Sequence, residues 1–128
     1  MQLNLQQIQM VTQGAEMIRE ENGALRFYRF TKEELALYRA RPAYWPTAVA
    51  TAGVQMEFRT DADALRLQLT ALDKKLYRRY FAYDILVNEQ LVGQLKNFPD
   101  VMENGHYDEA ELLDGPYSGC FCLGSGIK

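Results

Sequence analysis

Serine and histidine are the residue types in this sequence that could support nucleophilic catalysis, and there are few of them. The chain has two serines, Ser118 and Ser125, and one histidine, His106. A serine nucleophile needs a neighbouring base, usually a histidine that a carboxylate orients. Neither serine lies in the Gly-x-Ser-x-Gly pattern of a nucleophile turn, and His106 lies in the polar stretch Asn-Gly-His-Tyr-Asp-Glu. The sequence therefore predicts no catalytic residue in this chain.

Cysteine and histidine are also the usual ligands of zinc, which takes three or four of them in proteins. The chain offers Cys120, Cys122 and His106, together with carboxylates. A lone Cys-x-Cys is a weak metal signal, and its two side chains point the same way on a strand. A disulfide between such close neighbours would be strained. We expect two reduced thiols packed as small apolar residues, with no metal and no other cofactor.

Aromatic side chains provide the candidate ligand-binding residues of this chain, namely Tyr44, Trp45 and Tyr80. Aromatic faces can stack on sugar rings and anchor interfaces. Tyr44 and Trp45 lie in the predicted aromatic loop at residues 43–47, and Tyr80 follows the basic stretch at residues 74–79. The alternative for Trp45 is a place in the core at one end of the domain, which is the usual role of a single large apolar side chain.

The charge balance argues against general affinity for nucleic acid or an anionic membrane. The net charge is -3, with a sequence pI near 5.2. Residues 74–79 interleave basic and aromatic side chains, as in surfaces that bind single-stranded nucleic acid, but they predict a solvated loop in an otherwise acidic chain. We expect neither nucleic acid nor a membrane as a partner.

Length and composition predict one ordinary globular domain over residues 1–128. The N-terminus has neither a cationic start nor an apolar leader segment, and no stretch approaches the roughly 18 consecutive apolar residues of a membrane span. A cytoplasmic location is the simplest prediction.

The organising pattern of the chain is a twofold alternation of apolar and polar residues at 54–58 and again at 65–69. Because successive strand side chains point to opposite faces, each run predicts an antiparallel strand with its apolar side on the core. Asn-Gly at residues 22–23, between two apolar runs, predicts a tight hairpin. Residues 88–90 predict a second turn, without the glycine that the tightest turns prefer.

A capping box is predicted where Thr31 is followed by Glu34, so we expect one short α-helix at residues 32–39. No alternation of strands with long helices supports a parallel sheet. At least six short strands separated by turn signals predict an all-β fold, specifically an antiparallel β-sandwich of the jelly-roll-like kind.

Three stretches of the chain carry a family resemblance. The first stretch, residues 25–31, reads Leu-Arg-Phe-Tyr-Arg-Phe-Thr, and the second, residues 51–62, reads Thr-Ala-Gly-Val-Gln-Met-Glu-Phe-Arg-Thr-Asp-Ala. The third, residues 79–92, reads Arg-Tyr-Phe-Ala-Tyr-Asp-Ile-Leu-Val-Asn-Glu-Gln-Leu-Val. Together they resemble the N-terminal β-sandwich domain of bacterial SGNH/GDSL hydrolases, in which a jelly-roll-like sandwich precedes an α/β esterase domain, as in certain carbohydrate esterases.

The resemblance implies a domain that packs on a catalytic domain and helps to shape its substrate cleft. The Gly-Asp-Ser and Asp-x-x-His blocks of the family's catalytic domain do not occur in this sequence, so this chain is expected to be non-catalytic. The Asp-Gly hairpin turn of the family stands here as Asn88-Glu89. We expect residues 1–128 to be the N-terminal part of a longer two-domain ester hydrolase, with an acylated carbohydrate as a candidate substrate.

Arg59 and Arg66 lie on the polar side of the alternating runs, so they are the candidate residues for docking the catalytic domain. The alternative function is an independent carbohydrate-binding or protein-interaction β-sandwich, which would use Tyr44, Trp45 and Tyr80 as its stacking surface.

Overall fold

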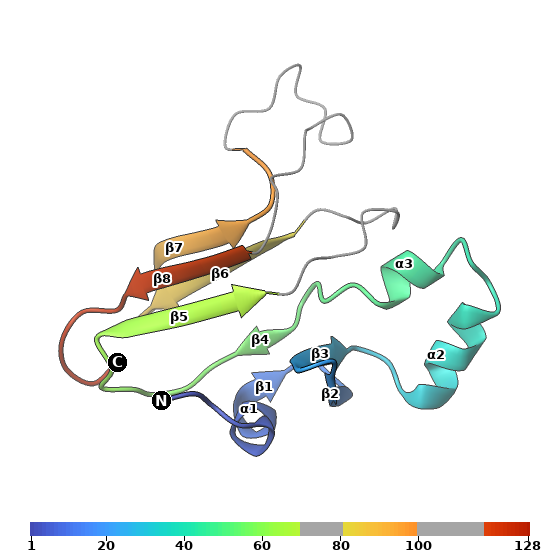
Figure 1. The fold of residues 1–128 in the computed structure, drawn as a ribbon, viewed down its shortest axis with the longest axis horizontal. Helices are drawn as coiled ribbons and strands as arrows, with labels where there is room; N and C mark the ends of the chain where they lie inside the picture. The colour runs from blue at the N-terminus through green and yellow to red at the C-terminus, as the bar shows by residue number, and fades with distance from the viewer. Residues whose placement is uncertain (70–80, 100–116) are drawn as a thin grey trace. The chain divides into compact units, whose positions relative to one another are not determined.

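The computed structural model describes residues 1–69, 81–99 and 117–128 (Figure 1). These residues form three short helices and eight strands. In chain order the elements are α1 (Leu5–Val11), β1 (Thr12–Gln13), β2 (Met17–Glu21), β3 (Ala24–Tyr28), α2 (Lys32–Arg39), α3 (Trp45–Ala48), β4 (Gln55–Met56), β5 (Ala64–Leu69), β6 (Ala82–Val87), β7 (Gln90–Lys96) and β8 (Tyr117–Cys122).

Every strand of the described residues belongs to an antiparallel pair, and the pairs are β1–β4, β2–β3, β5–β8 and β6–β7. The predicted all-β class is therefore confirmed. The described residues group into two compact units, one formed by Met1–Phe58 and the other by the described residues from 59 onward. The single domain expected from the chain length stays a prediction.

Helix α2 begins where its capping box predicts. The Thr31 hydroxyl accepts a hydrogen bond from the Glu34 amide, and the Glu34 carboxylate accepts one from the Thr31 amide, both at 3.2 Å. Asn4 and Gln7 form a second capping box at the start of α1. The helix expected at residues 32–39 is therefore confirmed, and α1 and α3 are two further short helices among the described residues.

Helix α3 replaces part of the predicted aromatic loop. Proline is tolerated in the first turn of a helix, so Pro46 does not prevent this short turn from forming. The guanidinium group of Arg29 donates hydrogen bonds to the carbonyl oxygens of Ala50 and Thr47, both at 2.7 Å. Arg29 thus satisfies backbone acceptors at the end of α3 and ties the helix to the segment after β3.

The two predicted hairpins are present with tight two-residue turns. Asn22 and Gly23 join β2 to β3 with φ of 53° and 78°, and Asn88 and Glu89 join β6 to β7 with φ of 48° and 67°. Positive φ at both central residues is the requirement of a type I′ turn. The turn after β6 is therefore tight although it contains no glycine.

Burial alternates along β5 as predicted: Leu65, Leu67 and Leu69 are half-buried, whereas the residues between them are exposed. The alternating run at residues 54–58 does not show this pattern of burial. Only Gln55–Met56 forms a strand there, and the side chains of Met56 and Phe58 are 40% and 39% exposed. The expectation that this run lays an apolar face on the core was wrong, because β4 pairs only with the two-residue β1.

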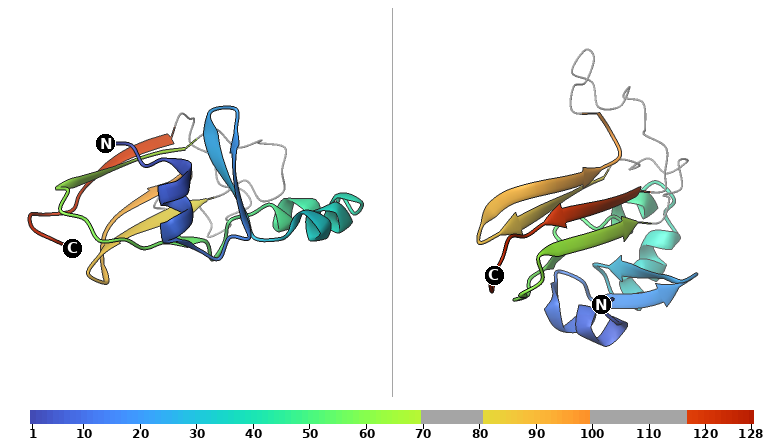
Figure 2. Two further views of the ribbon diagram at one scale, coloured as in Figure 1. Left: turned by 90° about the horizontal axis from the view of Figure 1, so that it is seen from below. Right: turned by 60° about the vertical axis from the view of Figure 1, so that its left-hand side comes forward.

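In the unit from residue 59 onward, the pairs β5–β8 and β6–β7 meet through a contact between β7 and β8, which lie next to each other in Figures 1 and 2. The ring of Phe121 on β8 covers the backbone of Gly93 on β7 and of Gly119 on its own strand. An added Cβ would lie 2.3 Å from the ring at Gly93 and 2.6 Å from it at Gly119. Any larger side chain at either glycine would displace this ring.

The polar residue Asn97 is the most deeply buried side chain described, with 1% of its surface exposed. Its Oδ1 atom accepts a hydrogen bond of 2.9 Å from the backbone amide of Phe81. The ring of Phe81 packs edge-on against Tyr117 at a centroid distance of 5.0 Å. Asn97, which follows β7, is therefore hydrogen-bonded to Phe81, which precedes β6 and contacts the first residue of β8.

Candidate functional site

The structure describes two of the three predicted stacking residues, Tyr44 and Trp45. Tyr44 is 57% exposed. Trp45 is half-buried, and the Arg39 guanidinium lies 4.9 Å from the centroid of its ring, as in a cation–π contact. Tyr80 lies outside the described residues, as do His106 and the basic stretch at residues 74–79. A glycan-stacking role for the three rings stays a prediction.

The candidate docking residues Arg59 and Arg66 are both exposed. Arg66 lies on β5 directly opposite Cys120 on β8, and Arg59 precedes the segment where Thr60 and Lys128 exchange backbone hydrogen bonds of 3.1 and 2.9 Å. Their place on the surface is compatible with docking, and the docking itself stays a prediction.

The two cysteines are free and exposed, so the expectation that they pack as small apolar residues was wrong. Burial on β8 falls on Tyr117, Gly119 and Phe121, which places both cysteines on the opposite, solvent side of the strand. Their reduced state stays a prediction. Within the described ranges, no three His, Cys, Asp or Glu side chains are grouped to hold a metal ion. No helix in that part of the chain is long and apolar enough to cross a membrane.

One face of the β2–β3 hairpin carries an ion-pair and hydrogen-bond network. The hydroxyl of Tyr28 donates a hydrogen bond of 2.7 Å to the Glu21 carboxylate, which also lies 3.7 Å from the Arg26 guanidinium. Tyr28 is 9% exposed. Burial, followed by the hydrogen bond to Glu21, raises the pKa of Tyr28 above its ordinary value because both disfavour the phenolate.

This raised pKa predicts a loss of stability at alkaline pH. The unfolded chain ionises Tyr28 near pH ~10, earlier than the folded chain does. The contribution of Tyr28 to folding stability is therefore complete below that pH, and it is lost as the pH rises through the pKa that Tyr28 has in the folded state. Urea unfolding from about pH 9 to 11 should show a larger loss for the wild type than for Tyr28→Phe. Equal losses in the two proteins would contradict the assigned direction of the shift.

A small hollow lies beside this network, between the hairpin and helix α2; we call it the α2 hollow. Its volume is about 160 Å³. The hairpin contributes Met17, Arg19 and Tyr28, and the helix contributes Lys32, Leu35, Ala36 and Arg39. The helical residues are spaced i, i+3, i+4 and i+7, so they share one face of α2. The hollow thus has an apolar floor and three cationic side chains at its rim.

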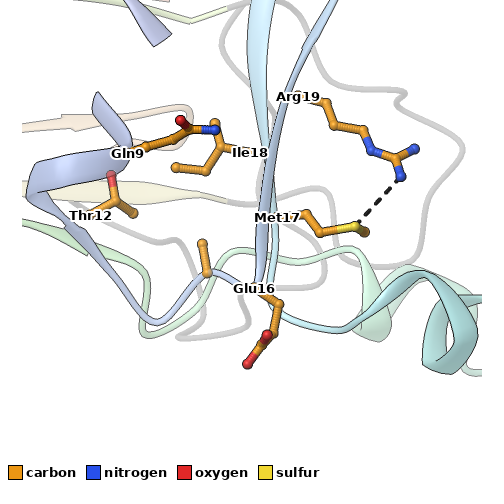
Figure 3. A pocket seen from close by; sticks show the side chains of 7 residues that line it. Gln9, Thr12, Glu16, Met17, Ile18 and Arg19 are labelled. Atoms are coloured by element: carbon orange, nitrogen blue, oxygen red, sulfur yellow. Dashed lines mark hydrogen bonds between the residues drawn. The ribbon is translucent and has the colours of Figure 1, made fainter. Parts of the chain in front are cut away.

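A second, larger hollow of about 450 Å³ runs along β2 (Figure 3). Figure 3 shows Gln9, Thr12 and Ile18 on one side of the hairpin ribbon, whereas Met17 and Arg19 lie on the other, where Arg19 donates a hydrogen bond to the Met17 sulfur. These side chains do not converge on a common point. This hollow is therefore a weaker candidate for a binding site than the α2 hollow.

Sequence reasoning missed the α2 hollow, although part of its signal was present. The helical spacing of Lys32, Leu35 and Arg39 could be recognised from the sequence once α2 was predicted. What could not be recognised was that Arg19 and Tyr28, on the strands of the hairpin, would complete the same hollow.

The sequence matches no protein-family model, and comparison with curated proteins and solved structures found no match.

Proposed function

We propose that this chain is the non-catalytic N-terminal accessory domain of an SGNH/GDSL-type esterase that acts on acylated substrates, including acylated carbohydrates. In this proposal the described strand pairs belong to a jelly-roll-like β-sandwich. The sandwich packs on the catalytic domain in cis and helps to shape its substrate cleft.

The observation that carries the proposal is an exposed apolar patch at the tip of the β6–β7 hairpin, formed by Leu86, Leu91 and Val92. Their side chains are 57%, 63% and 44% exposed, and Leu86 and Leu91 are direct partners in the strand register. Ile85, next to Leu86, is buried, so the hairpin has its own packed side and leaves this patch uncovered. Contiguous exposed apolar side chains are typical of surfaces that a partner covers.

The patch also lies in the stretch 79–92 that carries the family resemblance. A catalytic domain seated on the hairpin tip would remove these leucine side chains from water, which stabilises an interface by roughly 1.5–3 kcal/mol for each fully buried leucine. Arg59 and Arg66 are exposed as well, and in this proposal they contribute positive charges to docking of the catalytic domain.

The test is to express the natural open reading frame that contains these residues and to measure hydrolysis of a short-chain aryl ester. Replacing both Leu86 and Leu91 by aspartate should lower kcat/KM at least about tenfold, equivalent to about 1.4 kcal/mol. Leu37→Asp is the matched control, because Leu37 is 72% exposed on α2, outside the hairpin, and its variant should stay within about twofold.

Two further measurements complete this test. Charge reversal at Arg59 and Arg66 should weaken activity in the same direction, and unchanged activity would remove both arginines from the docking surface. The proposal fails if the reading frame encodes no Gly-Asp-Ser block after these residues. It also fails if residues 1–128 hydrolyse the ester alone, or if the double aspartate variant keeps full activity.

A further inference from the structure

We infer that the α2 hollow binds a small organic carboxylate whose apolar body is about the size of a benzene ring. The hollow belongs to the unit Met1–Phe58 and needs no second domain, so this inference stands apart from the accessory-domain proposal.

The floor of the hollow sets the size and polarity of the ligand. Leu35 and Tyr28 are buried to 7% and 9% exposure, and Met17 and Ala36 complete the apolar lining. The hollow is open to solvent on one side, unlike the closed engineered cavities of about 150 Å³ that bind benzene, and its volume of about 160 Å³ leaves room for a group of that size. A ring or a chain of about six carbons therefore fits this floor.

The rim sets the charge of the ligand. Arg19, Lys32 and Arg39 line the hollow, and no carboxylate of the described residues lies within ion-pair distance of them. The nearest acidic group in the hairpin network, Glu21, is already engaged by Tyr28 and Arg26. Three positive charges beside an apolar floor complement a carboxylate attached to an apolar body, and arginine binds carboxylates through two parallel hydrogen bonds.

The three cations do not contribute equally. The guanidinium of Arg39 lies over the ring of Trp45, which does not line the hollow, so its charge is held beside α3. Arg19 and Lys32 are therefore the cations on which recognition of the carboxylate mainly depends.

Benzoate is the probe, and the readout is the change in amide NMR shifts of the 128-residue chain. Benzoate should shift the amides of Leu35, Ala36 and Tyr28 in a saturable manner, with a Kd on the order of 1 mM for so small a ligand. Benzyl alcohol, which has the same ring but no charge, should bind at least about tenfold more weakly. Inorganic phosphate, which lacks the apolar body, should not shift these amides in a saturable manner.

Three variants localise the binding. Lys32→Gln should weaken benzoate about fivefold. Arg41→Gln removes the same charge from an exposed residue outside the hollow and should leave the affinity within about twofold. Ala36→Leu keeps every charge and fills the hollow, so it should abolish binding while circular dichroism shows an intact fold.

The inference is overturned if benzyl alcohol or phosphate binds as tightly as benzoate, or if Lys32→Gln behaves like Arg41→Gln. Absence of saturable shifts at benzoate concentrations about twentyfold above the expected Kd would also overturn it. Retained binding in a folded Ala36→Leu variant would place the ligand elsewhere.

Discussion

Replacing Gly14 by alanine is expected to lower the free energy of unfolding by about 2–4 kcal/mol. Two effects add at this position. Gly14 has a φ of +81°, which a residue with a Cβ adopts only with strain, and the new Cβ would lie 2.6 Å from the carbonyl oxygen of Gly53. That oxygen belongs to the backbone, so it cannot move aside by changing a rotamer. Urea or thermal unfolding of the variant measures the loss.

Gly53→Ala is the matched control for Gly14→Ala. Gly53 has nearly the same dihedral, φ +86°, but nothing lies within 4 Å of an added Cβ there. Its variant should lose only the conformational part, about 1–2 kcal/mol. The difference between the two variants gives the cost of separating the two backbone segments. Equal losses would contradict a close approach of Gly14 to Gly53.

Replacing Asn97 by alanine is expected to cost about 1–3 kcal/mol of stability. The Asn97 side chain is almost fully buried and accepts a hydrogen bond from the amide of Phe81. Its loss leaves that backbone amide without its side-chain acceptor and removes most of a buried side chain. Chemical denaturation followed by tyrosine or tryptophan fluorescence measures the effect.

Gln68→Ala serves as the control for Asn97→Ala, because it truncates an amide side chain that is exposed on β5. Its effect should stay within about 0.5 kcal/mol. If Asn97→Ala were as mild as Gln68→Ala, the buried hydrogen bond would not be a determinant of this end of the hairpin.

The features that the sequence predicted correctly are those that depend on neighbouring residues. Thr31 and Glu34 define the start of α2 within four residues, and Asn22 with Gly23 supplies both left-handed positions of a turn. The alternation along β5 likewise needs only the period of a strand. In each case the local preference and the tertiary structure agree, so a local pattern is sufficient to predict the helix, turn or strand.

The features that could not be predicted from the sequence depend on contacts between residues that are distant in the chain. No local pattern singles out Asn97, and its burial depends on the contact with Phe81, sixteen positions away. Met56 and Phe58 have a perfect strand alternation, yet their exposure is decided by the short partner β1. The α2 hollow needs the hairpin and the helix together, so no single stretch contains its signal.

The two tight turns have a consequence for the order in which the chain folds. Asn22-Gly23 enters the left-handed region readily in the unfolded chain, whereas Glu89 must reach a φ of 67° that its side chain disfavours. The first hairpin can therefore nucleate from its turn alone. The second requires strand contacts to hold its turn in place, so we expect β2–β3 to close earlier than β6–β7 during folding.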